Sequence, residues 1–119
     1  SPDMGASYFV TRRVGAMRAR QLFMLSDPID ARQCLEMGLV DEVVPDSELA
    51  QRAEALCARL AAAPRGSLAK IKHLCEGAMQ RGLQAQLALE QALLQECTHS
   101  QDAREGLQAF LEKRAPRFH

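Results

Sequence analysis

The chain has few aromatic residues, no net charge and no long apolar run, and each absence excludes a class of function. Its 119 residues include no tryptophan, one tyrosine and four phenylalanines, and fifteen basic residues balance fifteen acidic ones. Because basic residues occur singly and without interleaved aromatics, we expect no nucleic-acid partner. No apolar run approaches the roughly 18 residues of a membrane span, and no secretion signal opens the chain. We therefore expect no membrane partner and a cytoplasmic location.

The cysteines and histidines form no recognisable metal motif. Neither a C-x-x-C nor an H-x-x-x-H spacing occurs, so a zinc site is disfavoured. Cys57, Cys75 and Cys97 fall on or beside apolar helical stripes, where a thiol behaves as a small hydrophobe. We expect four buried free thiols, counting Cys34, with a disulfide pair as the alternative. His73 and His99 are expected to be surface or capping residues.

The apolar residues recur along most of the chain with the period of an α-helix. The length suits one compact domain with short helix-to-helix connections. Asp30 and Gln33 have the spacing of a capping box, and Gly15 has the position of a helix C-cap. Residues 39–44 read as a short strand or an extended link. We expect a mainly α, compact multi-helix chain with at most one short strand, its helices covering residues 5–13, 16–25, 31–37, 46 to the Pro64–Gly66 break, 67–78, 83–97 and 100–114.

The helix expected at 83–97 is apolar on more than one face. Leu83, Leu87 and Leu94 form one row, and Leu89 and Leu93 form another. A helix that is apolar over so wide an arc requires cover on two sides. This pattern favours a helix that faces a partner.

The closing segment, residues 100–119, has a complete set of helix signals. Ser100 suits an N-cap, Lys113 and Arg114 close the last turn, and Pro116 prevents continuation. Gly106 breaks the local rule, because glycine in mid-helix costs about 1 kcal/mol against alanine. A glycine kept there indicates close approach of another backbone or a ligand. The apolar stripe of this helix consists of Ala103, Leu107, Phe110 and Leu111.

Four ordered motifs resemble the crotonase (enoyl-CoA hydratase/isomerase) superfamily. They are the turn SPDMGAS at 1–7, the helix VGAMRA at 14–19, the segment at 27–45 containing MGLVDEVVP, and the closing string at 100–118. The resemblance spans essentially the whole chain. It implies the C-terminal region of a crotonase fold, with the β/α spiral core of such an enzyme missing, residues 1–45 as the end of that core and residues 46–119 as trimerisation helices.

The resemblance also implies an activity. The parent would be an enoyl-CoA hydratase or isomerase that acts on acyl-CoA through an enolate, with acyl-CoA as substrate and no cofactor. It would be a homo-oligomer, a trimer or a dimer of trimers. The chain alone is expected to be inactive, because the groups that stabilise the enolate lie outside it. The alternative is a helical oligomerisation module without catalysis.

Three residues are carried over as site candidates by this resemblance. Asp3, on the P-D-M-G turn, is expected to be catalytic, and the alternative is that it only caps the following helix. Phe110 and Lys113 are expected to bind coenzyme A, with the aromatic ring near the adenine and the ammonium near a phosphate. Their alternatives are a core side chain and a solvated charge. Arg114 and Lys70 are expected to be surface charges.

Overall fold

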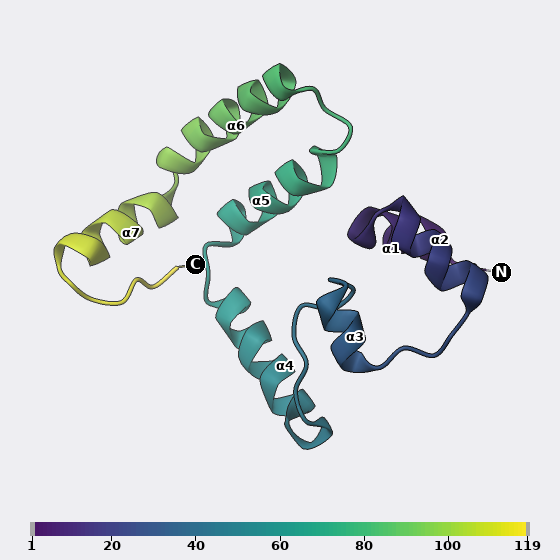
Figure 1. The fold of residues 1–119 in the computed structure, drawn as a ribbon. Helices are drawn as coiled ribbons and strands as arrows, with labels where there is room; N and C mark the ends of the chain where they lie inside the picture. The colour runs from purple at the N-terminus through teal and green to yellow at the C-terminus, as the bar shows by residue number, and fades with distance from the viewer. Residues whose placement is uncertain (1, 119) are drawn as a thin grey trace. The chain divides into compact units, whose positions relative to one another are not determined.

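The computed structural model describes residues 2–118, in which helices are joined by loops (Figure 1). The mainly α prediction is confirmed, and residues 2–118 contain no strand, so residues 39–44 form a link. Within the same range, no helix has the length and hydropathy needed to cross a membrane. The seven helices are α1 (Ala6–Val14), α2 (Ala16–Leu25), α3 (Ala31–Glu36), α4 (Asp46–Ala61), α5 (Arg65–Gly77), α6 (Leu83–Thr98) and α7 (Gln101–Leu111).

Three of the predicted caps are confirmed by hydrogen bonds. The Gly15 N–H donates to the Thr11 carbonyl at 2.9 Å and ends α1. At α3 the capping box is complete, because the Gln33 N–H donates to Asp30 at 2.8 Å and the Asp30 N–H donates to Gln33 at 2.9 Å. The Ser100 hydroxyl accepts from the Ala103 N–H at 3.1 Å and starts α7.

Two predicted boundaries were wrong. Helix α5 begins at Arg65 rather than at Ser67, with Pro64 as its N-cap residue. Proline is well tolerated at a helix start, where its missing N–H has no intrahelical partner to lose. Helix α7 ends at Leu111, so Lys113 lies beyond the last turn in which it was expected.

The chain divides into two compact units, one ending at Ala50 and the other beginning at Gln51. In the first unit α1 packs against α2. The Arg13 guanidinium, near the end of α1, donates to the Gly38 carbonyl at 2.6 Å and pairs with Asp41. One arginine therefore ties α1 to the link that follows α3.

In the second unit α5 and α6 pack against each other as consecutive helices, and α6 contacts α7 (Figure 1). Lys70 on α5 pairs with Glu96 on α6 at 3.1 Å, and the pKa of Lys70 is raised because its ammonium is hydrogen-bonded to that carboxylate. Nearby, the Ser67 hydroxyl lies 3.8 Å from the Cys97 thiol.

The turn between α5 and α6 is organised by Arg81. Its guanidinium donates to the carbonyls of His73 at 3.2 Å and Leu74 at 3.3 Å, at the C-terminus of α5. It also donates to the Gln86 side chain on α6 at 2.7 Å. The Leu74 carbonyl is one of the last four of α5, which lack an intrahelical donor, so the cation satisfies it. Gly77 leaves the space that the guanidinium occupies.

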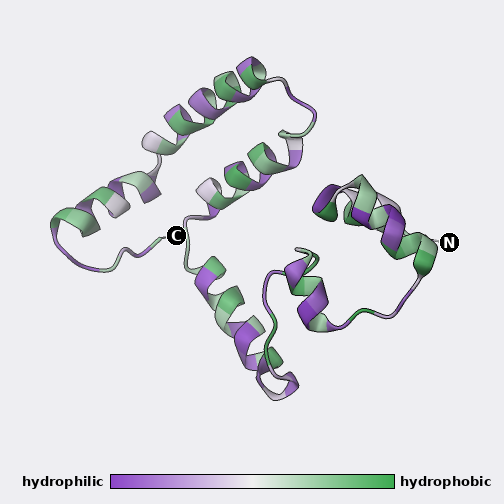
Figure 2. Cartoon of the chain, in the orientation of Figure 1, coloured by the Kyte–Doolittle hydropathy of each residue, from purple (hydrophilic) through white to green (hydrophobic). Residues whose placement is uncertain are grey.

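The described residues bury very few of their own apolar side chains. Among residues 2–118 only Ala19 and Ala109 are buried, at 2% and 1% exposure. On α6 the row of Leu89 and Leu93 is half-buried, whereas the other row is exposed, so the described residues cover only one of the two apolar sides. Figure 2 shows apolar residues recurring along α6 and α7 among polar ones. The exposed large residues on these two helices are Leu83, Leu87, Leu94, Leu107, Phe110 and Leu111.

The expectation for the cysteines was right about pairing and wrong about burial. All four thiols are free. Cys57 and Cys75 are exposed, and Cys34 and Cys97 are half-buried. The helical stripes that carry them are apolar, but the described residues do not cover those stripes.

The exposed apolar surface predicts how the 119-residue chain behaves in isolation. We expect it to self-associate, because contiguous apolar surface of this extent is uncommon on monomers. Size-exclusion chromatography with light scattering, over a concentration series, should give a mass above that of one chain. A strictly monomeric species at high concentration would contradict this expectation.

Candidate functional site

Asp3 lies on a tight left-handed turn that leads into α1. The Ala6 N–H donates to the Asp3 carbonyl at 2.8 Å and closes the turn. Both central residues have positive φ, with 48° at Met4 and 84° at Gly5. For an L-residue other than glycine this conformation costs about 1–2 kcal/mol, so the strain falls on Met4.

The capping alternative for Asp3 is not seen in the structure. The N-cap residue of α1 is Gly5, and no side-chain hydrogen bond caps this helix. Gly5 is required there for two reasons: its φ is left-handed, and an added Cβ would meet the Phe9 ring at 3.1 Å. The Asp3 side chain is exposed, which leaves its carboxylate accessible at the turn.

Lys113 is the left-handed residue of a Schellman motif at the end of α7. Its φ is 54°. The Lys113 N–H donates to the Phe110 carbonyl at 3.2 Å, and the Arg114 N–H donates to the Ala109 carbonyl at 3.0 Å. Glycine is the usual residue at this position, because a Cβ is disfavoured there. A lysine held in this conformation is an outlier of the kind that clusters at functional sites.

Phe110 and Lys113 are joined by that turn and are both exposed. Phe110 is 79% exposed, so it is not part of a core made by the described residues. Among residues 2–118, no ion pair involves Lys113. An exposed aromatic ring and a cation at one helix end can contact a planar base and a phosphate.

The neighbouring Arg114 is engaged within the chain. Its guanidinium binds both oxygens of Glu105, at 2.6 and 3.0 Å, and one oxygen of Glu112 at 2.6 Å. The two carboxylates raise the pKa of Arg114. The pKa of Glu112 is lowered by hydrogen bonds from Gln108 at 2.8 Å and from Arg114. Arg114 is therefore a structural charge, which leaves Lys113 as the exposed cation of this turn.

Gly106, which was expected to permit a close approach, faces the ring of Phe118. An added Cβ would lie 3.7 Å from that ring, an ordinary van der Waals contact. The approaching group among the described residues is thus the Phe118 side chain of the tail.

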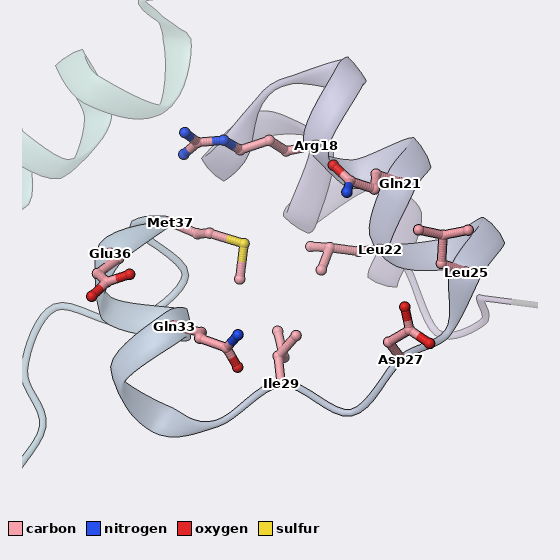
Figure 3. Close-up of a pocket in the computed structure, with 9 residues that line it drawn as sticks. All are labelled: Arg18, Gln21, Leu22, Leu25, Asp27, Ile29, Gln33, Glu36 and Met37. Atoms are coloured by element: carbon pink, nitrogen blue, oxygen red, sulfur yellow. The ribbon is translucent and has the colours of Figure 1, made fainter.

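The first unit also contains a pocket that the sequence did not reveal. It has a volume of about 300 Å³ and lies between α2 and α3. Figure 3 shows Leu22, Ile29 and Met37 converging in it, with Arg18 and Glu36 at its edge. None of the three predicted site residues lines this pocket.

The remaining candidates have structural roles. His99 shares a hydrogen bond of 2.7 Å with the Gln95 carbonyl, and the His73 carbonyl accepts from Arg81. No group of three or more potential metal ligands occurs within residues 2–118. Asp3 lies in the first unit, whereas Phe110 and Lys113 lie in the second.

Comparison with known proteins extends over the whole chain. The sequence model of the enoyl-CoA hydratase/isomerase family matches residues 1–119. A protein of Rhodobacter capsulatus, named "Probable enoyl-CoA hydratase", is 40% identical over 98% of this chain and 46% of its own length. The 1,2-epoxyphenylacetyl-CoA isomerase of Escherichia coli is 38% identical over 98% of this chain and 45% of its own length. The chain thus spans about half the length of the curated relatives that it matches.

Solved structures agree with the sequence comparison. The crystal structure of an enoyl-CoA hydratase from Polaromonas sp. JS666 superposes with a TM-score of 0.92 and 32% identity. This superposition covers 100% of this chain and 46% of the other. The helical arrangement is therefore one that occurs within larger proteins of known structure.

The strain at Lys113 predicts an unusual response to mutation. Lys113→Gly should stabilise the end of α7 by about 1 kcal/mol, because glycine adopts positive φ without the steric cost. Lys113→Ala, the matched control, keeps a Cβ and should not. Hydrogen exchange of the Arg114 amide, which donates to Ala109, measures the free energy of opening. Equal protection in the two variants would show that the turn is not strained.

Proposed function

Since this chain belongs to the enoyl-CoA hydratase/isomerase family, we propose that it is the C-terminal part of an enzyme that hydrates or isomerises enoyl-CoA thioesters through an enolate. The strained turn at Asp3 is the observation that carries this proposal. It presents an exposed carboxylate that caps no helix, next to a methionine held at positive φ. Such strain persists only where the surrounding structure over-determines it.

In the proposed reaction Asp3 transfers a proton. Removal of a proton from the enoyl chain by the carboxylate leaves an electron pair that delocalises onto the thioester oxygen as an enolate. Return of the proton to another carbon moves the double bond. In hydration the carboxylate would instead take a proton from water while the water oxygen adds to the β-carbon, and a proton delivered to the α-carbon of the resulting enolate completes the product. Donors that stabilise the enolate oxygen supply the largest contribution to such catalysis, and we assign them to residues outside this chain.

We also propose that the end of α7 binds the substrate. Phe110 and Lys113 would contact the adenosine and phosphate part of coenzyme A. Their exposure at one helix end and the left-handed backbone at Lys113 support this role. Lysine suits it as a mobile point charge. The acyl-CoA is a substrate in this scheme, and no resident cofactor is required.

The number of acidic residues at the site distinguishes an enzyme that hydrates from one that isomerises. Asp3 as the sole carboxylate favours isomerisation, and the name of the Escherichia coli relative is that of an isomerase. Additional glutamates outside this chain would favour hydration, and the Rhodobacter capsulatus relative is named as a hydratase. Activity on 2-enoyl-CoA and on 3-enoyl-CoA, measured separately, distinguishes the two reactions.

A helical assembly module is the second candidate function. It is favoured by the exposed apolar row on α6, which no described residue covers. In this scheme α4 to α7 would form the contacts of a homotrimer or a dimer of trimers. Assembly and catalysis are compatible in the intact protein, and they differ in what they predict for Asp3.

Substitution of Asp3 in the intact enzyme tests the catalytic proposal. Asp3→Asn should lower kcat by about 100- to 10,000-fold, the usual contribution of a general acid–base group, with KM changed little. Steady-state kinetics on both enoyl-CoA isomers measures the effect. Asp27→Asn is the control, because it removes another exposed carboxylate of the same unit and should leave kcat unchanged. An unchanged kcat in Asp3→Asn would remove Asp3 from the mechanism.

The 119-residue chain by itself should have no activity. Without donors for the enolate oxygen, Asp3 alone cannot stabilise the charge that develops during proton transfer. We expect purified chain to convert crotonyl-CoA no faster than buffer does, by the change in enoyl-thioester absorbance. Turnover by a preparation free of longer species would show that the donors lie within these residues.

A further inference from the structure

One carboxylate holds the segment that follows α7. The Glu105 side chain accepts two hydrogen bonds from the Arg114 guanidinium, at 2.6 and 3.0 Å. The same carboxylate accepts the Arg117 backbone N–H at 2.7 Å. Bidentate pairing with arginine fixes geometry as well as distance. Glu105 therefore anchors the chain at two points beyond the helix.

The two anchored residues, Arg114 and Arg117, follow the left-handed residue Lys113 in the chain. Helix α7 fixes the chain up to Leu111, and the Glu105 contacts fix it again from Arg114 onward. Lys113 lies between them with φ of 54°. A non-glycine residue in this region requires compensating contacts to remain there. Glu105, at 22% side-chain exposure, is the most enclosed partner in the network.

The charged residues around the turn have different roles. Glu105 and Glu112 share the one guanidinium of Arg114, so one of their two negative charges is compensated next to the exposed ammonium of Lys113. A free carboxylate at this position would repel a phosphate. The pairing thus orients Lys113 and also reduces the local negative potential.

We propose that Glu105 is a positioning residue that holds Lys113 in its left-handed turn and thereby sets the affinity of the intact enzyme for the phosphate end of its acyl-CoA substrate. The inference rests on the proposed contact between Lys113 and coenzyme A. Glu105 itself touches no substrate. Its effect reaches the ligand through Arg114 and the backbone of the turn.

The test compares two substrates in the intact enzyme that contains these residues. One is an enoyl-CoA, and the other is the same enoyl group on pantetheine, which lacks the adenosine and its phosphates. Glu105→Gln keeps the shape of the side chain and removes its charge. We expect it to raise KM for the enoyl-CoA by about 3- to 10-fold, the loss of one well-placed charged contact. The KM for the enoyl-pantetheine and both kcat values should change less than about twofold.

Two further variants distinguish positioning from general destabilisation. Glu96→Gln, which breaks the pair with Lys70 between α5 and α6, is the control and should leave the ratio of the two KM values unchanged. In a Lys113→Ala background, Glu105→Gln should add no further increase, because both substitutions act through one contact. Arg114→Met breaks the same clamp from the other side and carries the test if Glu105→Gln does not fold.

The outcomes separate the inference from the function that it rests on. If Lys113→Ala leaves the KM ratio unchanged, the proposed contact with coenzyme A is wrong. If Lys113→Ala raises the ratio and neither Glu105→Gln nor Arg114→Met does, the positioning role is overturned. An equal rise of KM for both substrates, or effects that add in the double variant, would assign Glu105 a purely structural role.

Discussion

Left-handed backbone at two of the three non-glycine residues that have positive φ is the constraint on which the candidate site depends. Met4 and Lys113 both have positive φ, and each lies at or next to a residue that the sequence had marked for chemistry. The turn at Met4 is closed by the Asp3 carbonyl, and the turn at Lys113 is closed by two backbone hydrogen bonds. Each turn projects a charged side chain from a helix end. The cost of each turn is of order 1–2 kcal/mol, which the flanking contacts must offset.

A second feature of the structure is its large exposed apolar surface. Consecutive helices pack within each unit, and polar side chains such as Arg13, Lys70 and Arg81 tie them together. These contacts leave most of the large apolar residues exposed. Hydrophobic burial is the dominant favourable contribution to folding. The exposed rows therefore fit the proposal that these helices contribute to a larger assembly, in which catalysis and subunit contact share one segment.

The sequence predicted those features that neighbouring residues determine. The capping box at Asp30, the cap at Ser100 and the number of helices follow from short-range chemistry. The left-handed turn at Lys113 was not predicted, because lysine has no preference for positive φ, and periodicity does not reveal the contacts of Glu105 with Arg114 and Arg117 beside it. Burial of the cysteines was predicted wrongly, since an apolar stripe does not reveal whether its partner is in the same chain. The pocket between α2 and α3 needs two helices placed together, which periodicity alone cannot give. The roles of Asp3, Phe110 and Lys113 remain predictions.

A crystal structure of the intact protein with a bound acyl-CoA would test the central claim most directly. The account predicts that Lys113 keeps its positive φ, with its ammonium at hydrogen-bond distance, about 3 Å, from a phosphate oxygen of the coenzyme. It also predicts the Asp3 carboxylate beside the acyl carbon that exchanges its proton. A helical conformation at Lys113, or a thioester bound away from the Asp3 turn, would contradict it.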